Sequence, residues 1–424
     1  MPHSHNENTA GFHGLGLAPA LLQIVEHLQF KTPTPIQTQA IPIAISGKDV
    51  AGIAQTGTGK TLAFGLPMIQ RLAQVKGQGL VVLPTRELAL QVDEMLAKIG
   101  ESLHLRTVVL IGGMSIGVQI RALGKFPHII IATPGRLIDH LNQKTVRLNN
   151  VKIVVLDEAD RMLDMGFLPQ IRKIFEAIPK ERQTMLFSAT MPPEIMKMAS
   201  TYMKLPVRVE IARQGTTVEK VTQELFIVKK EQKLSLLTKL LQDYHGSTLV
   251  FTKTKHGAKR ITRQLKAGGV GVAEIHSNRS LGQRREALDG FKSGKYRVLI
   301  ATDIASRGID VVGIELVINY DLPSTSHDYV HRIGRTARAG KGGHAITFAM
   351  PGDERDIRAI ERLTGKKLSI SKLPEGLPHV SMQHEPYESR RPSGHFRHPR
   401  SARSGGGGGH NKPRRHGGGY RSRT

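Results

Sequence analysis

Asp49-Val-Ala-Gly-Ile53 is a short apolar run, followed at once by Ala54-Gln-Thr-Gly-Thr-Gly-Lys-Thr61 and then by a helical pattern from Leu62 onward. A strand, a glycine-rich turn and a helix in this order are typical of a phosphate-binding loop. Glycines let the backbone curl so that its N–H groups face phosphate oxygens, and the amino end of the helix adds positive charge. Lys60 can reach the β- and γ-phosphates, and the Thr61 hydroxyl can ligate Mg²⁺. The residues expected to contact the nucleotide are Ala54, Gln55, Thr56, Gly57, Thr58, Gly59, Lys60 and Thr61.

The loop departs from the strict phosphate-loop pattern at Ala54, where glycine is usual. An acidic motif further along the chain nevertheless supports this interpretation. The apolar run Lys152–Leu156 ends in Asp157-Glu158-Ala159-Asp160. A carboxylate at the carboxyl end of a neighbouring strand can hold Mg²⁺, and the next carboxylate can orient an attacking water. We therefore predict binding and hydrolysis of a nucleoside triphosphate, with Mg²⁺ held by Asp157 and Thr61 and with Glu158 as the base.

Short apolar runs rich in Val and Ile alternate with helical patterns along most of the chain. Fully apolar strands separated by helices indicate parallel sheets that are covered on both faces. We therefore expect two doubly wound α/β domains, at residues 12–212 and 222–373, joined by a linker at residues 213–221. The predicted strands are Asp49–Ile53, Leu80–Leu83, Thr107–Ile111, His128–Ile131, Lys152–Leu156 and Thr184–Phe187 in the first domain, and Thr248–Phe251, Val270–Ile275, Tyr296–Ile300, Leu316–Asn319 and Ala345–Phe348 in the second.

The composition restricts the class of partner. The 424 residues carry 61 Lys and Arg against 35 Asp and Glu, a net charge of +26 that predicts nucleic acid or an acidic membrane face as partner. No apolar run is long enough to span a bilayer, and the amino end does not look like a signal peptide. The absence of Cys excludes disulfides and thiolate metal sites. We expect a cytoplasmic protein that faces nucleic acid and no membrane.

The two ends of the chain differ from the domains. Residues 381–424 carry ten basic and two acidic side chains, are rich in Gly, Arg and His, and have almost no aliphatic residues. Such a segment cannot bury enough surface to offset chain entropy, so we expect residues 374–424, like residues 1–11, to be disordered. The tail is interpreted as a loose nucleic-acid tether, with a solubilising role as the alternative. Its irregularly spaced histidines do not indicate a metal site.

The series of motifs between about Phe12 and Arg362 resembles the DEAD-box ATP-dependent RNA helicases of superfamily 2, and the short core and basic tail are most similar to the bacterial RhlE-type subgroup. This resemblance implies two tandem RecA-like domains. Phe12 and Pro33-Thr-Pro-Ile-Gln37 resemble the Q motif, which implies that Phe30 stacks on adenine and that Gln37 reads its edge. A glycine usually precedes this aromatic residue, and here it is Gln29.

The remaining motifs imply roles by the same resemblance. Ser188-Ala189-Thr190 would couple hydrolysis to strand separation, and Asp310 would contact the ribose. Arg335 and Arg338, in a motif with Ala337 where glycine is commoner, would be arginine fingers for the γ-phosphate. The expected RNA-backbone contacts are Pro84, Thr85, Arg86, Gly112, Gly113, Thr133, Pro134, Gly135 and Arg136 in the first domain and Thr302 in the second.

The function that follows is ATP-dependent local unwinding of short RNA duplexes, or remodelling of RNA–protein complexes. With the fingers on the second domain and the phosphate loop on the first, catalysis would require the two to close. An RNA clamp or chaperone whose ATPase times release, and a DNA helicase of the same superfamily, are the alternatives. The sequence does not choose between ribosomal and RNA-decay assemblies as partners.

Overall fold

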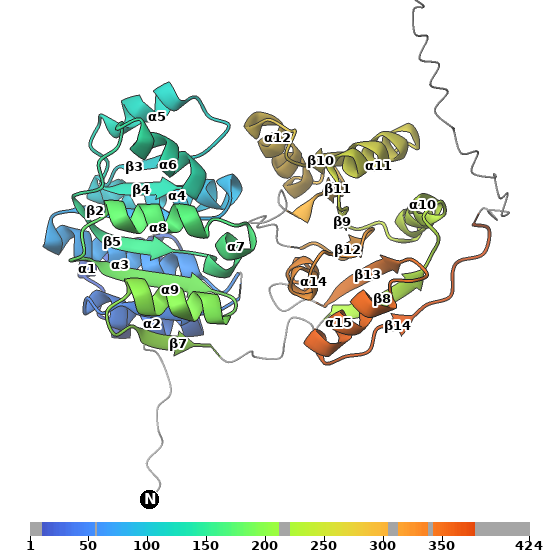
Figure 1. Cartoon of the computed structure of the whole chain (residues 1–424), viewed down its shortest axis with the longest axis horizontal. Helices are drawn as coiled ribbons and strands as arrows, with labels where there is room; N and C mark the ends of the chain where they lie inside the picture. The colour runs from blue at the N-terminus through green and yellow to red at the C-terminus, as the bar shows by residue number, and fades with distance from the viewer. Residues whose placement is uncertain (1–10, 56, 212–220, 304–312, 338–341, 378–424) are drawn as a thin grey trace, which may run out of the picture. The chain divides into compact units, whose positions relative to one another are not determined.

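The computed structural model describes residues 11–55, 57–211, 221–303, 313–337 and 342–377 (Figure 1). Thr56, Asp310, Arg338, most of the predicted linker and nearly all of both predicted disordered ends therefore lie outside the described residues. Within those ranges, no helix combines the length and the apolar character needed to cross a membrane.

The first sheet has seven parallel strands in the order β3-β4-β2-β5-β6-β1-β7. Because all its strands are parallel, their carboxyl ends meet at one edge, where β1 runs into the phosphate loop and β5 into Asp157. The strands are β1 (Val50–Ile53), β2 (Gln78–Val82), β3 (Thr107–Leu110), β4 (Ile129–Ala132), β5 (Val151–Leu156), β6 (Gln183–Ser188) and β7 (Val207–Glu210).

Successive residues of these strands point into two separate cores. In β4, Ile129 and Ile131 face one core and Ile130 and Ala132 the other, as the pleat of a strand requires. The first core is closed by α1 (Pro19–His27), α2 (Pro35–Ile45), α3 (Lys60–Val75) and α4 (Arg86–Gly100). The second is closed by α6 (Pro134–Asn142), α7 (Ala159–Asp164), α8 (Leu168–Ala177) and α9 (Pro193–Tyr202), while α5 (Ile116–Leu123) follows β3.

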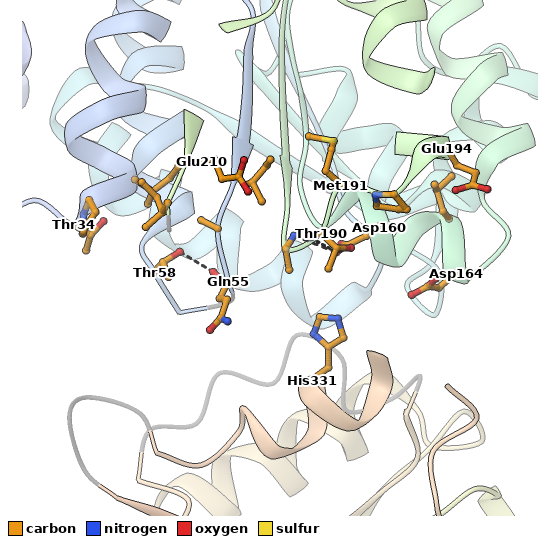
Figure 2. Close-up of a pocket in the computed structure, with 18 residues that line it drawn as sticks. Thr34, Gln55, Thr58, Asp160, Asp164, Thr190, Met191, Glu194, Glu210 and His331 are labelled. Carbon is orange, nitrogen blue, oxygen red and sulfur yellow. Dashed lines mark hydrogen bonds between the residues drawn. The ribbon is translucent and has the colours of Figure 1, made fainter. Parts of the chain in front are cut away.

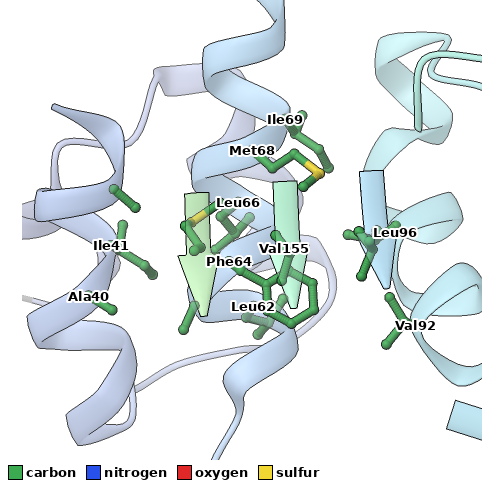
Figure 3. Close-up of a cluster of buried hydrophobic side chains, with 14 of the residues drawn as sticks. Ala40, Ile41, Leu62, Phe64, Leu66, Met68, Ile69, Val92, Leu96 and Val155 are labelled. Atoms are coloured by element: carbon green, nitrogen blue, oxygen red, sulfur yellow. The ribbon is translucent and has the colours of Figure 1, made fainter. Parts of the chain in front are cut away.

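Helix α3 fixes the position of the phosphate loop. Leu62, Phe64, Leu66 and Met68 are all buried among residues of the sheet and of α2 and α4 (Figure 3). The ring of Phe64 lies 5.6 Å from that of Phe187 in β6. Burial of each large apolar side chain contributes roughly 1.5–3 kcal/mol to stability. The packing of these four side chains therefore holds the amino end of α3 firmly against the sheet.

The second sheet repeats the architecture, with seven parallel strands in the order β10-β11-β9-β12-β13-β8-β14. Its strands are β8 (Val221–Ile227), β9 (Thr248–Phe251), β10 (Val272–Ile275), β11 (Val298–Ala301), β12 (Leu316–Asn319), β13 (Gly343–Ala349) and β14 (Ser369–Ile370). Its helices are α10 (Lys233–Asp243), α11 (Lys255–Ala267), α12 (Leu281–Lys292), α14 (Ser326–Ile333) and α15 (Glu354–Thr364).

The predicted fold class is confirmed, since each predicted apolar run overlaps a strand of one of the two sheets. Three strands were not predicted, namely β7, β8 and β14. Strand β7 alternates exposed and buried residues, and β14 is exposed, so neither has the continuous apolar run on which the prediction rested. Two boundaries also differ. Val221 begins β8 instead of ending the linker, and α3 begins at Lys60, two residues before Leu62, because Gly59 is its N-cap.

Candidate active site

The phosphate loop connects β1 to α3 through two residues with left-handed backbone. Gly57 has φ +81° and Gly59 has φ +85°, a conformation that only glycine adopts at no steric cost. Lys60 is buried, and its ammonium donates to the carbonyl of Ala54 at 3.2 Å. Thr58 donates its hydroxyl to the carbonyl of Gln55 at 2.7 Å, which closes the turn. The loop thus has the geometry of a phosphate cradle at a helix amino end.

Gln37 links the loop to α2. Its Oε1 accepts from the backbone N–H of Thr34 at 2.8 Å in a capping box, and its Nε2 donates to the carbonyl of Gly59 at 3.0 Å. A Cβ on Gly59 would overlap this Nε2. In the structure Gln37 is therefore buried against the phosphate loop, and one of its amide hydrogens is already used there.

Phe30 follows Gln29, a residue with left-handed backbone just beyond the carboxyl end of α1. The N–H of Phe30 donates to Val25 O and that of Gln29 to Glu26 O, which is the Schellman pattern of a helix carboxyl end. The pattern requires positive φ at Gln29, which has φ +61°. This explains why glycine is usual at this position. Ala337, the second departure noted in the sequence, also has positive φ, at +56°.

Asp157 leaves the end of β5 into a buried position close to Lys60. Its Oδ1 lies 3.7 Å from the Lys60 ammonium and accepts from the backbone N–H of Glu158 at 2.9 Å. Burial raises the pKa of Asp157 to about 6, although Lys60 acts to lower it. A buried carboxylate whose charge is disfavoured by desolvation is a suitable ligand for a divalent cation. Among the described residues, no group of three or more His, Cys, Asp or Glu side chains is placed to hold a metal ion, so Asp157 and Thr61 would share Mg²⁺ with the phosphates of ATP.

Glu158 is the N-cap of α7 and has φ +54°, a strained backbone for a residue that is not glycine. Its carboxylate accepts from Nη1 of Arg161 at 3.1 Å, and both side chains are buried. Burial opposes its charge, but Arg161 and Lys60 outweigh that effect and lower the pKa of Glu158. The carboxylate is therefore ionised and fixed in direction at neutral pH.

Asp160 connects the acidic motif to the end of β6. Its Oδ2 accepts from the backbone N–H of Ala189 at 3.2 Å and from both the N–H and the hydroxyl of Thr190 at 2.9 Å. The N–H of Asp160 donates in turn to the hydroxyl of Ser188 at 3.2 Å. Burial disfavours the carboxylate, yet Lys60 and the Thr190 hydrogen bond hold the pKa of Asp160 below its usual value.

A cavity of about 930 Å³ opens beside these motifs, lined by Thr34, Gln55, Thr58, Asp160 and Thr190 among others (Figure 2). Its size suits a nucleotide. His331 of α14 also lines it, and the imidazole points into the cavity in Figure 2. Burial and the nearby Arg161 lower the pKa of His331 to about 4, so the ring is neutral near pH 7.

A second group of predicted residues lies along the carboxyl ends of β2, β3 and β4. The guanidinium of Arg86 lies over Gly112 and Gly113, because a Cβ added to either glycine would come within 2.9 Å of it. Arg136 donates to the carbonyl of Met114 at 2.9 Å, next to the same turn. Thr85 and Thr133 are the N-caps of α4 and α6, so the amino ends of both helices lie at this edge, and the Thr85 hydroxyl accepts from the N–H of Leu88 at 3.3 Å.

In the second sheet, the predicted RNA contact Thr302 follows the carboxyl end of β11, and an ion pair lies next to it. Asp303, which follows Thr302, accepts from Nε and Nη2 of Arg332 at 2.6 and 2.7 Å. Arg332 also donates to Oδ1 of Asn319 at 3.2 Å. The backbone N–H of the buried Arg335 donates to the Arg332 carbonyl. The bidentate pair thus fixes the turn that carries Arg335.

Comparison with known proteins places both halves of the chain. The family model for DEAD/DEAH box helicases matches residues 34–198, and the model for the helicase conserved C-terminal domain matches residues 232–340. The DEAD-box ATP-dependent RNA helicase CshA of Bacillus subtilis (strain 168) is 44% identical over 369 residues, which cover 86% of this chain and 75% of that protein. The chain belongs to the DEAD-box ATP-dependent RNA helicases.

Other relatives of this DEAD-box helicase agree. CshA of Geobacillus kaustophilus is 45% identical over 368 residues, covering 86% of this chain and 78% of that protein. A structure of S. cerevisiae Dbp5 bound to RNA and ADP BeF3 has a TM-score of 0.76 and 31% identity, covering 86% of this chain and 96% of that one. Mss116p bound to ssRNA and AMP-PNP has a TM-score of 0.79 and 28% identity, covering 89% of this chain and 82% of that one.

Two arginines of the helicase without a predicted role pair with a predicted site residue or with the neighbour of one. Arg161 pairs with Glu158 and Arg332 with Asp303. Arg161 could have been found from its spacing, because residues three apart on a helix lie on one face. The Arg332–Asp303 pair joins segments far apart in the sequence, and no local pattern indicates it.

Proposed function

We propose that this DEAD-box helicase hydrolyses ATP at the edge formed by β1, β5 and β6, and uses the cycle to separate short RNA duplexes locally. The observation that carries the proposal is that Asp160 hydrogen-bonds Thr190. It joins the motif that would handle the γ-phosphate to the motif predicted to couple hydrolysis to strand separation. A change at the phosphates can therefore move the end of β6 directly.

In the catalytic step, Lys60 would neutralise the β- and γ-phosphates and Glu158 would orient the attacking water. Mg²⁺ bound to Asp157 and Thr61 would supply charge that stabilises the transferring phosphoryl group. Asp157 is suited to this because burial disfavours the charge of its carboxylate more than Lys60 and one backbone N–H favour it. Gln37 and Phe30 would receive the adenine, with Gln37 also holding the phosphate loop through Gly59.

RNA would bind along the edge that carries Arg86, Gly112, Gly113 and Arg136. Guanidinium groups and helix amino ends recognise phosphates without reading bases, so binding there would not depend on sequence. The proposal is supported by the Dbp5 and Mss116p structures, which contain RNA. Thr302 would extend this surface onto the second sheet, and Arg335 with Arg338 would stabilise the γ-phosphate when the two domains close around ATP.

Two finer assignments belong to the same proposal. The basic tail would act as an RNA tether, and the chain would fall in the RhlE-type subgroup because of its short core and its tail. The relatives named above carry the name CshA, so the subgroup rests on composition alone. Ribosomal or RNA-decay assemblies are the proposed settings.

The experiment measures ATP turnover without nucleic acid, with single-stranded RNA and with single-stranded DNA of matched length. We expect stimulation by RNA, little by DNA, and ATP-dependent displacement of a short RNA strand. Annealing without ATP and no displacement with ATP would indicate an RNA chaperone instead. Deleting Ser381–Thr424 should raise the RNA concentration that gives half-maximal turnover and leave kcat nearly unchanged, because it removes basic residues but none of the predicted catalytic residues. A collapsed kcat would contradict the tether.

A further inference from the structure

A chain of hydrogen bonds is buried beneath the Gly112–Gly113 turn. Gln119 of α5 donates its Nε2 to the carbonyl of Ile111 at 3.0 Å and faces that of Met114 at 3.4 Å. Its Oε1 lies 3.3 Å from Nε2 of His140, on α6. The Nδ1 of His140 lies 2.7 Å from the hydroxyl of Thr145. Gln119 and His140 are almost completely buried, at 1% and 0% exposed.

The direction of each hydrogen bond follows from the two carbonyls. Carbonyl oxygens only accept, so the Gln119 amide must turn its NH₂ toward Ile111 and Met114 and its oxygen toward His140. His140 must then carry its proton on Nε2. Its Nδ1 accepts from the Thr145 hydroxyl at 2.7 Å, a shorter contact than the 3.2 Å between this hydroxyl and the backbone carbonyl oxygen of His140. Burial and Arg136 lower the pKa of His140, which agrees with a neutral ring. Each member of the chain therefore donates a hydrogen bond to the next: Thr145 to His140, His140 to Gln119, and Gln119 to the backbone carbonyls.

The chain of bonds ends on both sides of the turn. Ile111 precedes Gly112, and Met114 follows Gly113, whose φ is +85°. One amide therefore holds the two carbonyls that flank the glycine pair. Arg136, one helical turn before His140 on α6, donates to the same Met114 carbonyl. Buried polar groups without a partner cost about 1–3 kcal/mol each, so this arrangement strongly favours one shape of the turn.

We propose that Thr145, His140 and Gln119 are positioning residues that hold the Gly112–Gly113 turn and Arg136 in the shape that accepts the RNA backbone. The inference rests on the proposed RNA surface. It adds three side chains that do not themselves reach the RNA, and it joins α5 to α6 beneath that surface. Thr145 is the outermost member, and its hydroxyl bonds to His140 alone among the described residues, so a change there tests transmission through the chain of bonds.

The test compares Thr145→Val with Thr145→Ser in the full-length protein. Valine has nearly the same shape but cannot donate to Nδ1, so the tautomer that turns a lone pair of Nε2 toward the Gln119 oxygen becomes accessible. Serine keeps the donor. We expect Thr145→Val to raise the concentration of single-stranded oligo(U) RNA at half-maximal ATPase about three- to tenfold. Turnover at saturating RNA and the KM for ATP should stay within twofold of wild type, and Thr145→Ser should restore the RNA response.

Gln119→Glu is the second variant, because a carboxylate there would face two carbonyl oxygens; a larger rise in the half-saturating RNA concentration is expected. Arg136→Ala distinguishes failure of the positioning inference from failure of the proposed RNA surface. If Arg136→Ala weakens the RNA response while both folded variants at Thr145 and Gln119 respond as wild type, the positioning inference is wrong and the RNA surface stands. If Arg136→Ala has no effect, both fail. Equal loss of kcat and RNA response in Thr145→Val would show a merely structural role and overturn the inference.

Discussion

The guanidinium of Arg161 lies 3.1 Å from the carboxylate of Glu158, and both side chains are buried. The proposed base therefore has a fixed partner on its own helix, three residues further along. Glu158 also has positive φ, so backbone and side chain are both held in an unusual arrangement. The pair orients the carboxylate before any substrate is bound.

Arg161→Ala should leave Glu158 buried without its nearest cation. Breaking a buried ion pair on one side costs about 3–5 kcal/mol, so the unfolding free energy of the first domain should fall by that order. Burial raises and Arg161 lowers the pKa of Glu158, so its removal should shift the acid limb of the RNA-stimulated pH–rate profile to higher pH. Arg172→Ala, at an exposed position on α8, is the control. Equal behaviour of the two variants would contradict the pairing.

Glu158→Gln should separate ATP binding from hydrolysis. Lys60, Thr61 and Asp157 are untouched, so ATP and Mg²⁺ should bind with near wild-type affinity. An amide cannot accept a proton from the attacking water, so turnover should fall by at least about 100-fold. The complex with RNA and ATP should then dissociate slowly. Single-turnover kinetics and RNA dissociation measure both effects, and normal RNA-stimulated turnover would exclude Glu158 as the base.

The raised pKa of Asp157 predicts the acid limit of activity at low Mg²⁺. Because burial raises this pKa to about 6, the carboxyl is ionised above pH 6 and increasingly protonated below it. A protonated carboxyl cannot ligate Mg²⁺, so ATPase activity at limiting Mg²⁺ should fall as the pH drops through about 6. Mg²⁺ competes with the proton, so excess Mg²⁺ should move the midpoint to lower pH. A midpoint independent of Mg²⁺ would rule out this assignment.

Gln29→Gly should stabilise the first domain. Gln29 has φ +61° at the carboxyl end of α1, and left-handed backbone costs a residue with a Cβ roughly 1 kcal/mol more than glycine. We expect a rise of about 0.5–1 kcal/mol in unfolding free energy, measured by chemical denaturation. Gln29→Ala keeps the Cβ and serves as the matched control, with no comparable gain. Stabilisation by both variants would point to the side chain of Gln29 as the cause.

Gln37→Ala should weaken the preference for ATP over GTP by about tenfold or more, since a buried amide that pairs with one base edge rejects another. The variant also loses the hydrogen bond to Gly59, so the affinity for both nucleotides should fall. Comparing kcat/KM for ATP and GTP separates the two effects. Thr38→Ala, exposed on the same helix, is the control. A fall in affinity with an unchanged ATP-to-GTP ratio would leave Gln37 only its role in holding the loop.

The sequence predicted the strands whose residues are apolar on both faces, because such runs stand out without any knowledge of their neighbours. Strand β7 was missed because it lies at the edge of its sheet and alternates polar with apolar residues. Strand β8 was missed because the polar residues Thr222, Gln223 and Glu224 follow its first residue and break the apolar run. The position of the acidic motif at the carboxyl end of a strand was likewise predicted from residue type and order, whereas its chemical role stays a prediction. What lay beyond the sequence were contacts between distant segments, such as Gln119 with His140, and the backbone angles that explain Gln29 and Ala337.

The interlock of Gln37 with Gly59 has a consequence for how such a sequence can change over evolutionary time. The side chain of one residue occupies the space that a Cβ on the other would need, and its amide is bonded to that residue's carbonyl. Neither position can drift while the other stays fixed, although 22 residues separate them. The two positions are therefore expected to change together, because a substitution at one alters the contact that the other makes with the phosphate loop.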